Sequence, residues 1–266
     1  MPESHSKIAE IVGYMKAHWP SQVKEEWQVS LEEYPELAKF AFLELTKDKT
    51  ASHTLVRIAG LSGSGKTSQL LPATEAYFES KNLRPVLVAA REFVKYHPHH
   101  DEIKDFYGEE NLRKMTDEFS TIMLFLVITE LIKNGFDIIL DVTLLAPEME
   151  AILQEMLKTA KYNQMILMIA ISTAVTEHFL SSRSWRHTKE TEEEFIRATK
   201  ESMNFYANNY GDTHIILWSV YDKPPVFDGK IHDCLDVFAD FSARTELPKK
   251  DDDERREAKI NYLKNL

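Results

Sequence analysis

The sequence predicts a three-layer α/β fold with a mainly parallel sheet of about five strands, preceded by extra N-terminal helices. Short apolar runs, each typical of a buried strand, alternate with longer segments of helical patterning. The apolar runs lie at residues 54–59, 85–90, 137–141, 164–171 and 213–220. The helical segments lie at residues 66–81, 115–134, 147–160 and 174–210. Because parallel strands need crossover connections, this alternation favours a parallel sheet covered by helices.

The two ends of the chain lie outside this alternation. Before about residue 47, apolar residues recur at helical spacing with two X-Pro interruptions, which predicts two or three helices. After about residue 245 an acidic triplet precedes a helix-forming stretch with few apolar residues, which we expect to be a solvated terminal helix. The expected division is a helical extension over 1–50, a principal domain over 51–245 and a charged tail helix over 246–266.

The composition argues against several classes of protein. The 266 residues include 43 acidic and 32 basic side chains, a net charge of -11 that opposes a broad nonspecific grip on nucleic acid or an anionic membrane. The one cysteine, Cys234, cannot form an intramolecular disulfide, and no Cys/His pairs have zinc-ligand spacing. With no apolar run of about 18 residues, we expect a cytoplasmic protein without nucleic-acid or membrane partners.

A phosphate-binding loop follows the first predicted strand. Residues 60–67, GLSGSGKT, satisfy the pattern GxxxxGK[ST] and are followed by a helical segment. Glycines let backbone N–H groups turn toward phosphates, the lysine reaches the β and γ oxygens, and the threonine holds Mg²⁺. The expected nucleotide-binding residues are Gly60, Gly63, Ser64, Gly65, Lys66, Thr67 and Ser68. The motif predicts a P-loop NTPase or kinase fold that binds ATP and Mg²⁺, but alone it does not separate kinases from ATPases or GTPases.

Two further segments resemble a known family. The run Phe93 to Glu102, with its F-x-x-x-H-P element, and the run Asn134 to Leu144 occur in order after the loop. Together they resemble the zeta toxins, P-loop kinases of bacterial toxin–antitoxin modules that phosphorylate UDP-N-acetylglucosamine. The resemblance covers roughly Val56 to Phe227 and is that of a divergent member. It implies that Asp141 and Thr143 match the family's acidic residue and threonine, which contact metal and substrate.

The chain departs from the family at the position of the acceptor base. Arg91 stands where zeta toxins carry an aspartate that orients or deprotonates the acceptor hydroxyl, and Leu145 stands where they carry an arginine. Phosphoryl transfer needs mainly positioning and charge neutralisation, so a nearby carboxylate suffices. Glu92 and Asp141 are the two candidates, and Asp141 is also a candidate for Mg²⁺. Arg91 suits either an anionic substrate or a surface ion pair.

Histidine and arginine side chains complete the candidate site. His97 is assigned either to the substrate or, as a structural residue, to a side-chain hydrogen bond with the backbone at the turn before Pro98. Arg183 and Arg186, three residues apart, are candidate lid arginines that neutralise charge on the transferred phosphoryl group. Arg197 is a third candidate, and pairing with the acidic run at 190–194 is the alternative for each. Arg183 is the first choice.

These observations predict an ATP- and Mg²⁺-dependent small-molecule kinase whose acceptor is a hydroxyl group, with a nucleotide sugar such as UDP-N-acetylglucosamine as one acceptor. The alternative is a catalytically impaired nucleotide-binding module that acts through a protein partner. Arg91 and Leu145 favour this alternative. The resemblance also implies a small helical antitoxin-like partner, and the N-terminal helices are candidates either for its contact surface or for its substitute. A guanine-reading N-K-x-D segment is not found in the sequence.

Overall fold

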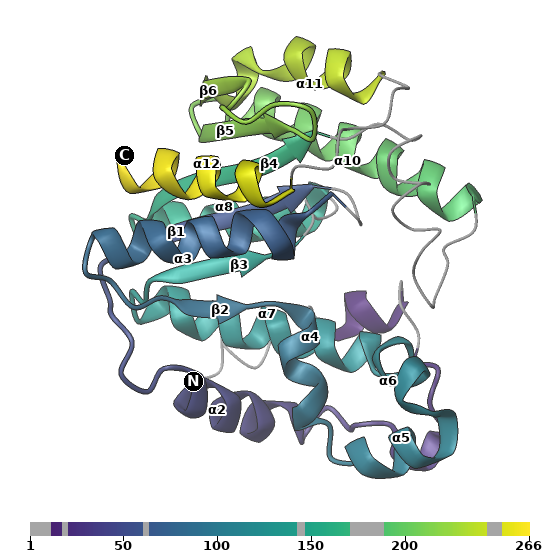
Figure 1. Cartoon of the computed structure of the whole chain (residues 1–266). Coiled ribbons are helices and arrows are strands. Elements are labelled where there is room, and N and C mark those ends of the chain that lie inside the picture. Colours follow the sequence, from purple (N-terminus) through teal and green to yellow (C-terminus); the bar gives the residue numbers. More distant parts are fainter. Residues whose placement is uncertain (1–11, 18–20, 61–63, 143–146, 171–188, 244–251) are drawn as a thin grey trace.

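A six-stranded sheet forms the centre of the computed structural model (Figure 1). The structure describes residues 12–17, 21–60, 64–142, 147–170, 189–243 and 252–266. The strand order is β2-β3-β1-β4-β5-β6, with β6 antiparallel to β5 and all other neighbours parallel. The strands are β1 (Thr54–Gly60), β2 (Val86–Val88), β3 (Ile138–Asp141), β4 (Asn163–Ala170), β5 (His214–Ser219) and β6 (Phe227–Lys230).

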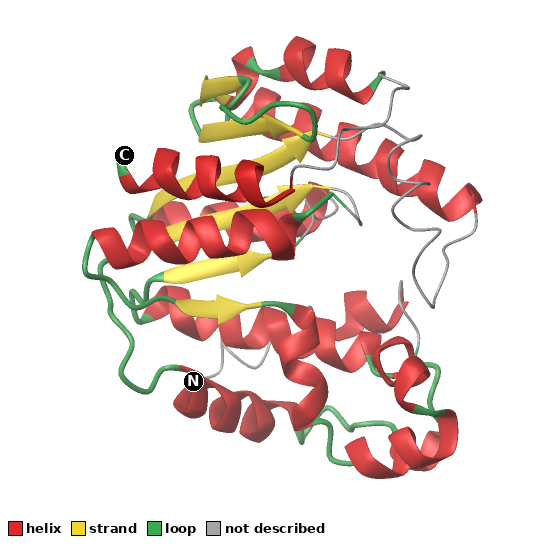
Figure 2. Cartoon of the chain, in the orientation of Figure 1, coloured by secondary structure: helices red, strands yellow, loops and turns green. Residues whose placement is uncertain are grey.

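Helices cover both faces of the sheet (Figure 2). The helices are α2 (Tyr34–Leu45), α3 (Leu71–Ser80), α4 (Ala90–Phe93), α5 (His100–Tyr107), α6 (Glu109–Met115), α7 (Asp117–Lys133), α8 (Pro147–Thr159), α10 (Lys189–Asn209), α11 (Leu235–Ser242) and α12 (Asp252–Lys264). A π-helical turn, η2 (Lys66–Leu70), leads into α3, and the short 3₁₀ turns are η1 (Glu25–Trp27), η3 (Val94–Tyr96) and η4 (Ile231–Asp233). The three-layer α/β class predicted from the sequence is confirmed.

The alternation of side chains along β1 sorts the helices into layers. Val56 and Ile58 belong to a buried cluster with residues of α3 and α12. Leu55 faces the opposite side, in a cluster with residues of α2, α7 and α8. Ala59 joins a third cluster, which contains residues of α10 and α11. Because successive residues of a strand point to opposite faces, α3 and α12 form one outer layer, and α7, α8, α10 and α11 form the other.

All five predicted strands are observed, and a sixth was missed. β6 has the sequence FDGK, and its burial alternates between half-buried and exposed. A four-residue strand that contains two charged residues and a glycine carries almost no apolar signal, so its position is set by its pairing with β5. Helices α5, α6 and α11 were also missed. Trp218 of β5 is fully buried.

The C-terminal helix α12 is not the solvated helix that the sequence predicted. Arg255, Lys259 and Leu263 are between 0% and 2% exposed, and α12 lies beside α3 and contacts η2 (Figure 1). Tyr262 packs edge-on against Trp218, with ring centroids 5.9 Å apart. The expectation failed because the aliphatic stems of long charged side chains pack like apolar groups, and a count of apolar residues does not register them.

The described N-terminal helices share the core of the sheet. Met15, Tyr34, Ala38 and Ala41 are buried in the cluster that contains α7 residues such as Phe119. The ring of Tyr34 stacks on Phe119 at a centroid distance of 5.7 Å. Helix α2 therefore packs on the face of the sheet opposite to α3, the helix that continues the phosphate loop.

Candidate active site

The candidate site is built at the carboxyl edge of three neighbouring parallel strands. β1 ends at Gly60, β3 ends at Asp141, and β2 is followed by α4, which carries Arg91. Asp141 is paired in register with Ile58 of β1. It therefore lies beside the residue two positions before Gly60, where the phosphate loop begins. Ile139 faces the α3 layer, and alternation places Asp141 on that same side of β3. In parallel sheets ligands bind at this edge.

Two glycines of the loop are required by its backbone. Gly60 has φ 129° and Gly65 has φ 93°, a region that residues with a Cβ rarely adopt. A Cβ on Gly60 would also lie 3.0 Å from the carbonyl oxygen of Ile169 and 3.0 Å from Ser64 Oγ. The loop can therefore turn tightly against β4 only with glycine at these positions. Gly63 lies outside the described residues.

The polar groups of the loop fit a phosphate ligand. Lys66 Nζ donates a hydrogen bond to the carbonyl oxygen of Gly60 at 2.7 Å, which holds the ammonium over the loop. Ser64 Oγ is buried and makes no hydrogen bond to any described part of the chain. Thr67 and Ser68 are exposed at the start of the helix. An ammonium, an unsatisfied buried hydroxyl and a helix N-terminus are together suited to bind an anion.

Asp141 is the least exposed of the three charged residues that follow or end β2 and β3. Its side chain is 2% exposed and accepts a hydrogen bond from Arg91 at 2.6 Å, measured from Nη1 to Oδ2. The Arg91 Nε atom lies 3.3 Å from a carboxylate oxygen of Glu92. Arg91 and Glu92 are 33% and 40% exposed. The structure thus brings together the three residues predicted after β2 and β3, but as an ion-paired cluster with one positive and two negative charges.

Sequence reasoning named all three residues of this cluster without predicting that Arg91 and Asp141 pair. The signal that could have found the pair is positional, since both residues follow neighbouring strands at the same edge. That signal requires knowing that β2 and β3 are adjacent, which they are although α4 to α7 separate them in sequence. An arginine placed between two carboxylates is also a weaker attractor of anions than a lone guanidinium.

His97 makes the structural contact that was weighed for it. Its Nδ1 atom accepts a hydrogen bond from the backbone N–H of His99 at 3.1 Å. The ring is 4% exposed and packs edge-on against Phe119, with centroids 4.6 Å apart. Burial, reinforced by the nearby His99 and His100, lowers the pKa of His97 to about 4. These contacts suit a neutral imidazole that shapes the turn around Pro98.

Several predicted residues lie outside the described part of the chain: Gly63, Thr143, Leu145, Arg183 and Arg186. Arg197, the third lid candidate, lies on α10. Its side chain is 70% exposed and its Nε atom is 3.8 Å from Glu201, one helical turn away. This is a surface pairing of the kind that was the alternative for each lid arginine, here with Glu201.

A buried polar network that the sequence did not reveal joins β1 to the helices behind the loop. Arg57 forms a two-pronged ion pair with Glu150 of α8, at 2.7 and 2.8 Å. Tyr206 of α10 donates to the same carboxylate at 2.8 Å and accepts from Gln154 at 2.7 Å. Arg57, Glu150 and Tyr206 are 0–1% exposed. The network fixes α8 and α10 to the strand that carries the loop.

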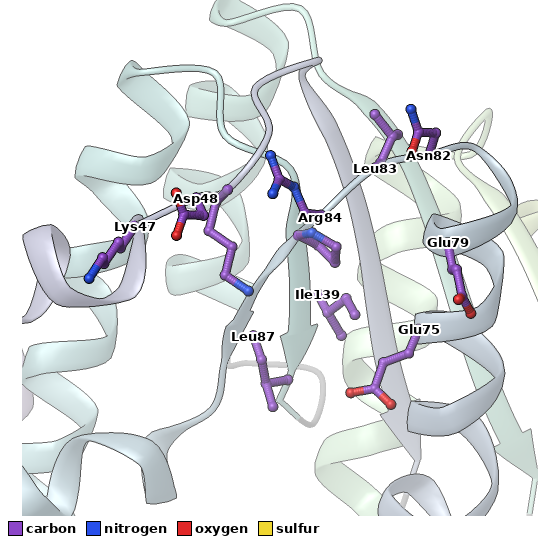
Figure 3. Close-up of a pocket in the computed structure, with 11 residues that line it drawn as sticks. Lys47, Asp48, Glu75, Glu79, Asn82, Leu83, Arg84, Leu87 and Ile139 are labelled. Atoms are coloured by element: carbon purple, nitrogen blue, oxygen red, sulfur yellow. The ribbon is translucent and has the colours of Figure 1, made fainter.

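A second concave region lies away from the phosphate loop (Figure 3). Its floor includes Leu87 and Ile139, and Glu75 and Glu79 of α3 line one side. Basic side chains line it as well, among them Lys47 and Arg84. The lining includes three cations, Lys47, Lys49 and Arg84, and three carboxylates, Asp48, Glu75 and Glu79. The groove therefore offers no net attraction to a polyphosphate. None of the described phosphate-loop residues, and neither Asp141 nor Arg91, contributes to it.

The sheet order, the loop between β1 and α3, and the acidic end of β3 define a P-loop protein of the kinase type. Comparison with family models matches residues 42–220, more than half of the chain, to the zeta toxin family. The chain therefore belongs to the zeta toxin family. The match includes α2 from Phe42 onward and ends after β5, so α12 lies beyond it.

Solved structures support the fold. One chain from the PezAT chromosomal toxin–antitoxin system of the human pathogen Streptococcus pneumoniae superposes with a TM-score of 0.65 at 19% identity, covering 90% of this chain and 100% of that one. A candidate kinase from Chloroflexus aurantiacus J-10-fl matches with a TM-score of 0.35 at 17% identity, over 50% of this chain and 68% of that one. That similarity is too low to carry an argument. A search of curated proteins gave no significant match.

Proposed function

We propose that the protein is an ATP- and Mg²⁺-dependent kinase that transfers a phosphoryl group to a hydroxyl of a small molecule. The observation that carries the proposal is the placement of Lys66 and the buried carboxylate of Asp141 at the ends of adjacent strands, in a member of the zeta toxin family. A phosphate-binding ammonium beside a strand-end carboxylate is the arrangement that phosphoryl transfer requires.

The phosphate loop would bind and orient the triphosphate. Lys66 would move its ammonium from the Gly60 carbonyl to the β and γ oxygens, while Ser64 and the N–H groups of the first helical turn donate to phosphate oxygens. Thr67 and Asp141 supply the hard oxygen donors suited to Mg²⁺, which would neutralise charge on the phosphoryl group. Mg²⁺ usually keeps several waters, so one carboxylate and one hydroxyl suffice as its protein ligands.

The acceptor would lie on the side of Glu92 and Asp141. Glu92 is the more exposed of the two carboxylates, at 40% against 2%. A carboxylate within hydrogen-bonding reach of the acceptor hydroxyl orients it and takes its proton as the bond to phosphorus forms. Glu92 is therefore the better candidate for this role, and Asp141 for the metal.

The test is turnover with a panel of acceptors. Purified protein with ATP and Mg²⁺ should release ADP when a nucleotide sugar is supplied, and UDP-N-acetylglucosamine is the first compound to try. Lys66→Ala should reduce the rate by at least a hundredfold because it removes charge neutralisation made in the transition state. No ADP release with any nucleotide sugar or nucleoside would contradict the proposal.

A nucleotide-binding module that acts through a protein partner is the second candidate. The ion pair between Arg91 and Asp141 favours it, because it occupies the carboxylate that metal binding needs. Calorimetry distinguishes the two candidates. Tight ATP binding with no acceptor that stimulates ADP release supports the module. ADP release that is stimulated by an acceptor supports the kinase.

We also propose a protein partner of the antitoxin kind, because the similar solved chain comes from a toxin–antitoxin system. Within the described part of the chain, every helix is too short or too polar to cross a lipid bilayer. Co-expression with the product of a neighbouring gene, followed by size-exclusion chromatography, tests for such a partner. A protein that elutes alone in every such pairing counts against it.

A further inference from the structure

The ion pair between Arg91 and Asp141 bears on how Mg²⁺ and nucleotide bind to the candidate site. Asp141 is nearly inaccessible, and the only cation that contacts its carboxylate in the described part of the chain is Arg91, at 2.6 Å. A buried carboxylate needs a cation or hydrogen-bond donors to offset its desolvation. Arg91 supplies that compensation in the structure.

Arg91 is held in a way that lets it leave. Its side chain is one-third exposed, and its second partner, Glu92, lies on the same helical turn at 3.3 Å. If the guanidinium left Asp141, the contact with Glu92 would keep it near the site, and water would reach its remaining donors. By contrast, the fully buried pair between Arg57 and Glu150 has no such exit.

A guanidinium hydrogen-bonded to a carboxylate opposes the binding of Mg²⁺ to that same carboxylate, because the two cations repel each other. Both are cations, and Oδ2 of Asp141 is already in a short charge-assisted hydrogen bond. Resting on the proposed function, we propose that Arg91 is an internal counter-cation that occupies Asp141 until Mg²⁺ and nucleotide bind, and that the exchange of one cation for the other sets the metal-dependent affinity for nucleotide. Arg91 is in this sense a positioning residue that acts through Asp141.

Calorimetric titration with a non-hydrolysable ATP analogue tests the exchange. Arg91→Gln should bind the analogue about tenfold more tightly than wild type in the presence of Mg²⁺, the effect expected when one partly buried charge-assisted hydrogen bond no longer has to be broken. In excess chelator without Mg²⁺ the two proteins should agree within about twofold. Arg91→Lys keeps the charge with poorer geometry and should show a smaller gain, about threefold.

Two controls separate the ion pair from a general change in charge. Arg84→Gln removes the same charge from the opposite end of β2, in the groove of Figure 3, and should leave the affinity unchanged. The gain from Arg91→Gln should also disappear in an Asp141→Asn background, because no carboxylate remains there for the arginine to occupy. A gain of equal size in that background, or with Arg84→Gln, would overturn the proposal.

A direct metal titration keeps this inference apart from the proposed function. Mn²⁺ alone, followed by electron paramagnetic resonance, should bind Arg91→Gln about tenfold more tightly than wild type. Unchanged Mn²⁺ affinity overturns the exchange even if the protein proves to be a kinase. Failure of every variant to bind nucleotide, with the Mn²⁺ gain intact, overturns the kinase and the predicted effect on nucleotide affinity, and leaves only the exchange of cations at Asp141 standing.

Discussion

Two aspartates flank the same short strand and are held in opposite ways. Asp137 precedes β3 at the amino end of the sheet and is 0% exposed. It accepts hydrogen bonds from the hydroxyls of Thr50 and Ser52 at 2.5 and 2.6 Å, and from the N–H groups of Ser52 and Thr54 at 3.2 and 3.1 Å. Asp141 ends β3 and is held by one partly exposed arginine.

The difference teaches how to separate structural from functional carboxylates in this fold. All the partners of Asp137 are neutral, local to the segment that enters β1, and fixed by the backbone, so nothing can displace them at small cost. The partner of Asp141 is a single charged side chain from another strand end, which a cation can replace. Burial alone does not distinguish the two residues, whereas the kind of partner does.

The largest expected effect follows from removing Asp137. Asp137→Ala leaves four donors without their acceptor and should lower the free energy of unfolding by about 4 kcal/mol. Asp141→Ala releases only a partly exposed arginine and should lower it by about 1 kcal/mol. Urea unfolding followed by circular dichroism measures both. Equal losses in the two variants would show that the two ends of β3 are not different in kind.

A second prediction compares a buried ion pair with an exposed one. Glu150→Gln leaves the buried guanidinium of Arg57 without its charge partner and should cost about 3 kcal/mol of stability. Glu130→Gln, which breaks an exposed pair with Lys133 on α7, is the matched control and should cost less than about 0.5 kcal/mol. A loss at Glu150 as small as the control's would mean that the network is not what holds α8 and α10.

The sequence predicted the parts of the site that depend on local pattern. The loop motif, the strand ends and Asp141 could be found because each has its signal within about ten residues. The pairing of Arg91 with Asp141 could not, since it depends on strand order, and neither could the buried ion pair of Arg57, which sits within an apolar run that predicts a strand. The burial of Lys259 is a further case, because it depends on α12 packing beside α3.

A third and smaller effect concerns which group at the carboxyl edge responds to pH. The pKa of His97 is lowered to about 4 by burial, below the value near 6.5 expected in the unfolded chain. The stabilisation that comes from keeping this ring neutral is therefore fully present above pH 6.5 and is lost as the pH falls toward 4. Between pH 8 and pH 5 the loss should be about 2 kcal/mol.

His97→Asn isolates this contribution, because the amide oxygen of asparagine can accept the N–H of His99 in place of Nδ1 and does not titrate in this range. Unfolding in urea at pH 8, 6.5 and 5 should show wild type losing about 2 kcal/mol more than the variant. If both proteins lose stability in parallel, the acid sensitivity comes from the carboxylate pairs instead.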